Sequence, residues 1–298
     1  MVTNALSVDV EEYFQVSNFD RVLDRSEWEA LPSRVVASTG HLLDLFDEAG
    51  VHATFFSLGW VAERQPGLLR EIRDRGHELG CHGYGHELVY ELGPARFRED
   101  LRRAVRAIED AVGAPVRGYR AASYSVTRDS LWALDILAEE GFTFDSSIFP
   151  VRHPRYGIPG FRRLPARLRL PSGARIDEFP LTTLPVGPVN LPLAGGAYLR
   201  FLPANCFRFG LRRLVARGEP VVLYLHPWEV DPEQPRLAAG LRVRINHYFN
   251  LRRTLPRLRR LLASHRFAPV GEVLGGLARA GRLPEVELGA AWRAMPAV

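Results

Sequence analysis

The sequence predicts an α/β fold in which parallel strands are covered by helices, either as a barrel or as an open sheet. Short apolar segments alternate with amphipathic segments of helical period along most of the chain. Glycines such as Gly50, Gly76 and Gly141 directly follow the helical segments, as is common at helix ends. Polar side chains gather where the apolar segments end, which is where β/α barrels place their active sites.

Seven segments are expected to be buried strands, because they are short, apolar and bounded by turn residues. They are residues 5–10, 53–59, 78–81, 116–120, 143–145, 220–225 and 267–269. Six segments between them repeat apolar residues at helical spacing, and two of these open with a proline, Pro66 and Pro94, as helices often do. These expected helices are residues 33–49, 66–75, 94–112, 130–140, 204–217 and 241–264.

Residues 150–203 interrupt this alternation because they are rich in proline and glycine, and we expect hairpins and loops there. No internal repeat or low-complexity linker divides the sequence. We therefore expect one domain over residues 1–298, with a core at about 5–275 and a C-terminal tail.

The composition is that of an ordinary globular protein, with 46% hydrophobic and 24% charged residues among 298. The net charge of +5 does not indicate a nucleic-acid partner, because all 39 basic residues are arginines that are not interleaved with aromatics. Two cysteines, Cys81 and Cys206, are too few for a disulfide framework and favour a reducing compartment. We find no signal peptide and no apolar run of about 18 residues, so we expect a cytoplasmic protein without a membrane span.

Two histidines four residues apart, His82 and His86, follow the expected strand 78–81. Two imidazoles at this spacing can bind one divalent metal if a third ligand and an open position lie nearby, although the spacing alone is weak evidence. The first strand supplies candidates, because Asp9 and Glu11 are two residues apart and therefore share a face. A metal that binds water beside a free carboxylate base indicates hydrolysis.

Three further polar residues, Arg120, Asp145 and His226, lie at or just past the ends of expected strands. In a β/α barrel these strand ends form one face, so the side chains would converge there. Each also has a purely structural interpretation. Arg120 could pair with a structural carboxylate, Asp145 could belong to a turn or helix cap, and His226 could be a core histidine.

Four runs of residues carry a family resemblance. They are Asp9-Val10-Glu11, HGYGH at 82–86, RAASY at 120–124 and LYLHP at 223–227. These runs resemble the motifs of the polysaccharide deacetylases of carbohydrate esterase family 4, which have the NodB-homology fold. Longer runs narrow the resemblance to the subgroup found in exosortase-linked exopolysaccharide loci: VDVEEYFQV at 8–16, DSSIFP at 145–150, GGAYLR at 195–200 and HPWE at 226–229.

The resemblance implies a deformed (β/α) barrel with about seven parallel strands. It implies hydrolysis of N-acetyl groups from an amino-sugar polysaccharide or its precursor, in exopolysaccharide biosynthesis, with possible exopolysaccharide-assembly partners. It also implies a divalent metal, commonly zinc, held by His82, His86 and one carboxylate.

The remaining roles follow from the same resemblance. Asp9 is implied to be the general base, oriented by Arg120. His226 is implied to be the general acid, oriented by Asp145. The aromatic side chains of Tyr13, Tyr124 and Trp228 are candidates for a sugar-binding groove, although aromatics near strand ends are also often part of the core.

The sequence departs from the family pattern at three places. The usual adjacent aspartates are replaced by Asp-x-Glu-Glu, so the metal carboxylate is Glu11 or Glu12, and strand alternation favours Glu11. Ala122 stands where proline is usual, which bears on any oxyanion donor at Ser123. The tryptophan that usually follows the fourth-motif aspartate is absent.

Two other functions are open at this point. One is a metal-dependent amidohydrolase acting on a small cyclic amide. The other is an inactive sugar-binding module, against which the retention of the five residues Asp9, His82, His86, Arg120 and His226 argues.

Overall fold

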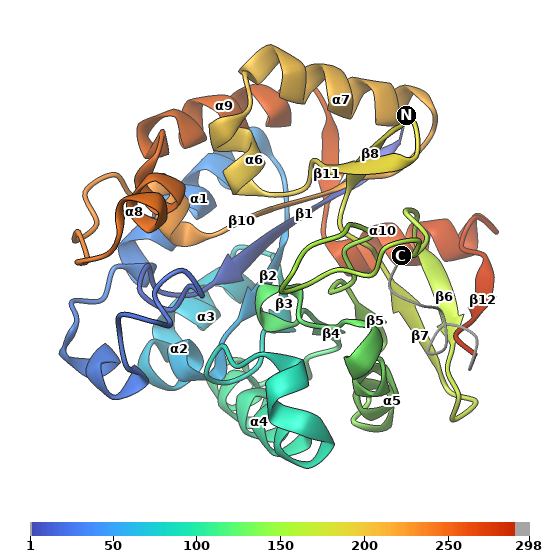
Figure 1. Ribbon diagram of the computed structural model, residues 1–298, viewed down its shortest axis with the longest axis horizontal. Helices are drawn as coiled ribbons and strands as arrows, with labels where there is room; N and C mark the ends of the chain where they lie inside the picture. The colour runs from blue at the N-terminus through green and yellow to red at the C-terminus, as the bar shows by residue number, and fades with distance from the viewer. Residues whose placement is uncertain (1, 290–298) are drawn as a thin grey trace.

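The computed structural model describes residues 2–289 and contains a curved, mostly parallel sheet with helices packed outside it (Figure 1). The strands of this sheet are β1 (Thr3–Val10), β2 (Thr54–Ser57), β3 (Glu78–Cys81), β4 (Gly118–Tyr119), β5 (Phe144–Asp145), β6 (Ala166–Arg169), β7 (Arg175–Glu178), β10 (Val222–Leu225), β11 (Arg266–Ala268) and β12 (Glu285–Glu287). Their order is β10-β1-β2-β3-β4-β5-β7-β6-β12, with β11 paired to β1.

The strands from β10 through β1 to β5 and β7 all pair in parallel, whereas β6 runs antiparallel to β7. Parallel neighbours need long crossovers, and helices provide them between β1 and β2, β2 and β3, β3 and β4, and β4 and β5. The expected deformed (β/α) barrel with about seven parallel strands is confirmed.

The barrel closes between β7 and β10 through an irregular segment. Thr182 Oγ1 donates to Val222 O at 2.9 Å and accepts from Val222 N at 2.8 Å. Farther along β10, Tyr224 N donates to Ala194 O at 3.0 Å. One threonine side chain thus replaces part of a strand ladder, which accounts for the deformation at this side of the barrel.

Ten α-helices are described. They are α1 (Val35–Ala49), α2 (Gly59–Arg64), α3 (Pro66–Asp74), α4 (Val89–Val112), α5 (Trp132–Glu139), α6 (Gly196–Phe201), α7 (Ala204–Ala216), α8 (Leu241–Tyr248), α9 (Thr254–Leu262) and α10 (Val270–Arg279). The expected helix after residue 32 ends as predicted, because Gly50 adopts the left-handed conformation with φ 62°. Within the described residues, every helix is too short or too polar to cross a lipid bilayer.

The predicted helix over 241–264 is wrong as a single element. The structure divides it into α8, a short 3-10 turn over Leu251–Arg253 and α9. The break lies at Asn250, whose φ of 56° is left-handed and whose side chain donates to Arg200 O at 3.1 Å. A tertiary hydrogen bond therefore overrides helical periodicity at this position.

Residues 150–203 contain the expected hairpins, β6 with β7 and β8 (Thr183–Val186) with β9 (Val189–Pro192). These residues are not an accessory insertion, because β7 joins the main sheet beside β5. They also contain helix α6, which was not expected. Where we expected a tail, α10 follows β11, and β12 pairs with β6.

Two acidic side chains, Asp145 and Glu178, lie side by side at the ends of β5 and β7 and are fully buried. Ile148 N donates to Glu178 Oε1 at 3.1 Å. Burial raises the pKa of Glu178 well above its ordinary value of 4.5, and the neighbouring Asp145 raises it further. The pair therefore holds its proton more tightly in the folded protein than in the unfolded chain.

This pair predicts a specific pH dependence of stability. A carboxyl whose pKa rises on folding contributes stability below its unfolded pKa, and that contribution is lost as the pH rises through the folded pKa. Glu178→Gln keeps the acceptor for Ile148 and a donor for Asp145 but cannot ionise. We expect the wild-type protein to lose unfolding free energy relative to Glu178→Gln as the pH rises above about 4.5, the ordinary pKa of a glutamate, in urea denaturation. Parallel stability curves for the two proteins would contradict this.

Candidate active site

The turn after β3 brings His82 and His86 together. Gly83 has a φ of 78°, and His86 itself adopts the left-handed conformation with φ 54°. A non-glycine residue in this conformation is strained, and such strain is common at functional sites. Both histidines are buried, and their ring centroids lie 5.5 Å apart.

The tautomer of His82 is fixed by a hydrogen bond. Its Nδ1 lies 2.7 Å from Arg120 O, which can only accept, so Nδ1 carries the proton and Nε2 keeps its lone pair. Burial lowers the pKa of His82 to about 4, and the imidazole is therefore neutral at neutral pH. A neutral ring with a free Nε2 is the form that binds a metal.

Glu11 lies beside these rings, directly after β1. Its carboxylate and the two imidazoles form the group Glu11, His82 and His86, whose ligand atoms all lie within 4.8 Å of one another. Glu11 Oε2 is 3.0 Å from His86 Nε2 but has no hydrogen-bond partner, while Oε1 accepts from Trp228 Nε1 at 3.1 Å. A buried carboxylate oxygen left unpaired against imidazole nitrogens fits a divalent cation, so these three residues can hold one.

Glu12, the alternative ligand, points elsewhere. Its Oε2 accepts from Arg34 N at 2.9 Å, and its Oε1 accepts from the Ser33 hydroxyl. These contacts lie at the beginning of α1, where backbone N–H groups lack helical partners and a carboxylate is favourable. The structure therefore gives Glu12 a capping position and leaves Glu11 with the histidines.

Asp9 is held by the buried Arg120. Arg120 NH1 lies 2.8 Å from Asp9 Oδ1 and 2.6 Å from Ser7 Oγ, so Ser7 and Asp9 share a face as alternation requires. The other oxygen of Asp9 accepts weakly from Tyr124 Oη at 3.3 Å and lies 3.8 Å from His226 Nε2. Asp9 thus has one oxygen fixed by arginine and one facing His226.

His226 closes the arrangement from β10. Its Nε2 lies 3.6 Å from Glu11 Oε1, and its Nδ1 lies 3.1 Å from Glu229 Oε2. Burial by itself would lower the pKa of His226, but Glu11 and Glu229 outweigh it and raise that pKa to about 9. Burial would likewise raise the pKa of Glu11, whereas His86 and His226 lower it to about 2.

The expectation that Asp145 orients His226 is wrong. Asp145 accepts from Ser147 Oγ at 2.5 Å and from Ser147 N at 3.2 Å, which is a local turn of the kind left open above. Ser147 Oγ in turn accepts from Ala121 N at 2.8 Å, so Asp145 fixes the backbone that follows Arg120. The carboxylate on His226 is Glu229, which sequence reasoning missed.

A cavity of about 440 Å³ gives access to these groups. Its lining includes Asp9, Glu11, His82, His86 and His226, with aromatic side chains from α6 and from residues 153–156. Tyr124 and Trp228 line it, whereas Tyr13 packs against Phe14 in a hydrophobic cluster that also contains Trp228.

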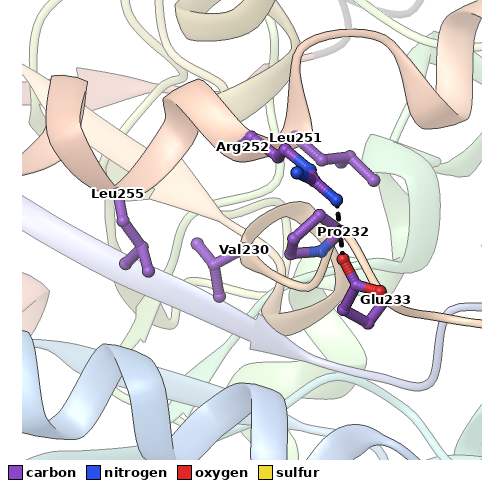
Figure 2. A pocket seen from close by; sticks show the side chains of 6 residues that line it. All are labelled: Val230, Pro232, Glu233, Leu251, Arg252 and Leu255. Atoms are coloured by element: carbon purple, nitrogen blue, oxygen red, sulfur yellow. Dashed lines mark hydrogen bonds and ion pairs between the residues drawn. The ribbon is translucent and has the colours of Figure 1, made fainter.

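A second pocket of about 310 Å³ lies between the turn after His226 and the segment that begins α9 (Figure 2). Arg252 pairs with Glu233 at 3.0 Å, the contact marked by the dashed line in Figure 2, and both side chains are exposed. A solvated ion pair beside the apolar Val230, Leu251 and Leu255 offers no reacting group, so we place the site in the larger cavity.

Two family models match the chain in succession. Residues 26–143 match the family described as polysaccharide deacetylase, and residues 146–275 match one described as a domain of unknown function, DUF3473. The first match contains His82, His86 and Arg120, and the second contains His226.

The chain is also similar to curated relatives and to a solved structure. The chain is 31% identical over 111 residues to a peptidoglycan deacetylase-like protein of Gibberella zeae, and 32% identical over 107 residues to a peptidoglycan deacetylase of Helicobacter pylori. These alignments cover 37% and 36% of this chain. They cover 32% and 36% of the two relatives, so the chain spans about a third of the length of each. A crystal structure described as a "putative polysaccharide deacetylase" from Mycobacterium smegmatis shares the fold, with a TM-score of 0.67, 21% identity, and coverage of 97% of this chain and 94% of that one.

The two glutamates after β1 give a direct test of the metal ligands. We expect Glu11→Ala to lose bound divalent metal in elemental analysis of the purified protein, because one of three ligands is removed. Glu12→Ala is the matched control. It should keep its metal and lose about 1 kcal/mol of unfolding free energy, the usual cost of removing a helix cap. Loss of metal in Glu12→Ala with full metal in Glu11→Ala would reverse the assignment.

Proposed function

From the match of residues 26–143 to the polysaccharide deacetylases, we propose that this protein hydrolyses N-acetyl groups of an amino-sugar glycan with a divalent metal. The observation that carries the proposal is the convergence of a candidate base, a candidate acid and a candidate metal site. His226 Nε2 lies 3.8 Å from Asp9 and 3.6 Å from Glu11, at one cavity. A general base, a general acid and a metal each lower the barrier to amide hydrolysis near neutral pH.

A divalent cation held by Glu11, His82 and His86 would polarise the acetyl carbonyl and make water more acidic. Zinc suits a site of two imidazoles and one carboxylate, and it is the metal we propose.

Asp9 is the proposed general base. Arg120 supports this role, since its buried guanidinium pairs with one oxygen of Asp9 at 2.8 Å and holds the carboxylate in place. The arginine occupies Oδ1 and leaves Oδ2 facing the cavity, where it can accept a proton from water. A general base needs a fixed carboxylate with one oxygen within reach of the proton that it takes.

His226 is the proposed general acid. Its Nδ1 is occupied by Glu229, and its Nε2 faces Asp9 and Glu11 across the cavity. A proton on Nε2 can pass to the leaving nitrogen when the carbon–nitrogen bond breaks, so the amine departs neutral.

The substrate class we propose is an N-acetylated glycan, in keeping with the aromatic side chains that line the cavity. The runs at 8–16, 145–150, 195–200 and 226–229 support a role in exopolysaccharide biosynthesis, with a precursor glycan as substrate. Both cysteines are free, Cys81 buried and Cys206 exposed, which is compatible with action in the cytoplasm.

Metal dependence is tested with the whole protein and a panel of N-acetylated oligosaccharides. We expect acetate release in the presence of zinc, loss of release after treatment with a chelator, and recovery on adding zinc back. Release of acetate that survives complete metal removal would overturn the metal-dependent mechanism. Absence of release from every glycan, with metal bound, would favour a binding module.

Asp9→Asn separates chemistry from metal binding. The amide preserves the shape of the carboxylate and can still accept from Arg120, but it cannot take a proton. We expect kcat to fall by roughly 10²-fold or more with unchanged metal content, the scale of general-base catalysis. Unchanged turnover would remove Asp9 from the mechanism.

His226→Ala is expected to lower kcat by roughly 10²-fold as well, while metal content stays at the wild-type level. The three proposed ligands remain in place, so elemental analysis distinguishes an acid from a ligand. Loss of metal in His226→Ala would make His226 a ligand instead.

A further inference from the structure

The ring of His226 is held from behind by a buried carboxylate. Glu229 is fully buried, and its Oε2 accepts from the backbone N of His226 at 3.1 Å and lies 3.1 Å from His226 Nδ1. The two residues span one short 3-10 turn, Pro227–Val230, so the contact is local and leaves the ring little freedom.

The other oxygen of Glu229 is paired with Arg200, on α6. Arg200 Nε donates to Glu229 Oε1 at 2.9 Å, and both side chains are 1% exposed. The remaining N–H groups of Arg200 donate to backbone carbonyls at the end of α8 and just beyond it: Asn246 O at 3.1 Å, His247 O at 3.1 Å and Phe249 O at 2.8 Å. A guanidinium with this many fixed acceptors is rigid, and it favours the carbonyl end of a helix.

The backbone of α6 approaches this pair very closely. A Cβ at Gly196 would lie 1.9 Å from Glu229 Oε2, so only glycine fits at this position. The runs GGAYLR at 195–200 and HPWE at 226–229 are therefore in contact. Both Gly196 and Arg200 of the first run lie against Glu229 of the second. Both runs lie outside residues 26–143.

We infer that Glu229, paired with Arg200, is the positioning residue that fixes the ring orientation and the Nδ1 tautomer of His226. The inference rests on the proposed function, in which His226 gives a proton from Nε2. With Nδ1–H donated to Glu229, the only ring nitrogen that faces the cavity is Nε2. Asp145, to which the family resemblance gave this role, contacts Ser147 instead.

Arg200 keeps Glu229 in its acceptor form. Burial alone would raise the pKa of Glu229, but Arg200 and then His226 outweigh burial and lower it. An ionised carboxylate accepts hydrogen bonds and donates none, so His226 Nδ1–H is the donor in this contact. The arginine thus acts on the histidine through the glutamate.

The primary test is Glu229→Gln, measured by steady-state kinetics and by nitrogen-15 NMR of histidine-labelled protein. We expect kcat to fall about 10- to 100-fold, the usual effect of losing a partner behind a functional histidine, with KM and metal content unchanged. The NMR spectrum, recorded above about pH 9 where the His226 ring is neutral, should show loss of the single Nδ1–H tautomer of His226, assigned by comparison with His226→Ala.

A double variant separates positioning from a merely structural role. In the His226→Ala background, Glu229→Gln should lower kcat by less than twofold, because its effect passes through the missing ring. A further loss as large as in the single variant would overturn the inference. Arg200→Lys keeps the positive charge but not the planar guanidinium with its several donors. This variant should fold, and its kcat should fall by less than that of Glu229→Gln.

Arg257→Gln is the matched control. Arg257 NH1 donates to Arg200 O at 3.1 Å and to Leu202 O at 3.0 Å, so it holds the end of α6 without touching Glu229. This variant should keep wild-type kcat and the His226 tautomer. If the wild type releases no acetate from any glycan, the proposed function fails, while the tautomer signal still decides the positioning role. An unchanged tautomer in Glu229→Gln would contradict the inference whatever the activity.

Discussion

The buried ion pair between Arg120 and Asp9 is the interaction on which the rest of the site depends. Arg120 is fully buried, and a buried charge is costly unless its partners satisfy it. Its guanidinium lies 4.4 Å from the ring of Phe56 and donates to Ser7, Asp9 and Ser146, which ties together β1, β4 and the end of β5. Removing one partner of such a pair typically costs about 3–5 kcal/mol, so this part of the barrel tolerates little change.

The same arginine controls both halves of the proposed chemistry. Its side chain fixes Asp9, while its backbone carbonyl accepts from His82 Nδ1 at 2.7 Å. One residue therefore sets the orientation of the proposed base and of a candidate metal ligand. Asp145 and Ser147 stabilise the backbone just after it, because Ala121 N donates to Ser147 Oγ. Asp145 therefore stabilises the backbone next to Arg120, whereas the family resemblance implied that it orients His226.

Much of the fold and most of the site could be predicted because the signals are local. Period-2 alternation placed Asp9 and Glu11 on one face, and the four-residue spacing of His82 and His86 reflects a single turn. The strand ends converge because parallel strands share a direction, which the β/α rhythm already implied.

What could not be predicted depends on contacts between distant segments. Glu178 reaches Asp145 only because β7 is inserted beside β5, and the sequence pattern of residues 150–203 indicated hairpins without their place in the sheet. Asn250 breaks a helical pattern for a hydrogen bond to Arg200, which lies 50 residues earlier. Glu229 did leave a local signal, since an acidic residue three positions after a cap residue is typical of a capping box, and here the cap is His226.

The choice between Glu11 and Glu12 shows how the surroundings of a carboxylate decide its role. Both glutamates follow β1 and both are buried. They are adjacent residues of the same type, so their sequence context is almost identical. Glu12 is saturated by the beginning of α1, with Arg34 N and the Ser33 hydroxyl as donors. Glu11 receives one donor, Trp228 Nε1 on Oε1, and this bond turns Oε2 toward the histidines. The tryptophan of the HPWE run thus fixes the carboxylate on one side, and the glutamate of that run fixes His226 on the other. A run of four residues after β10 therefore orients two of the groups that the proposed reaction requires, from a segment outside the deacetylase match.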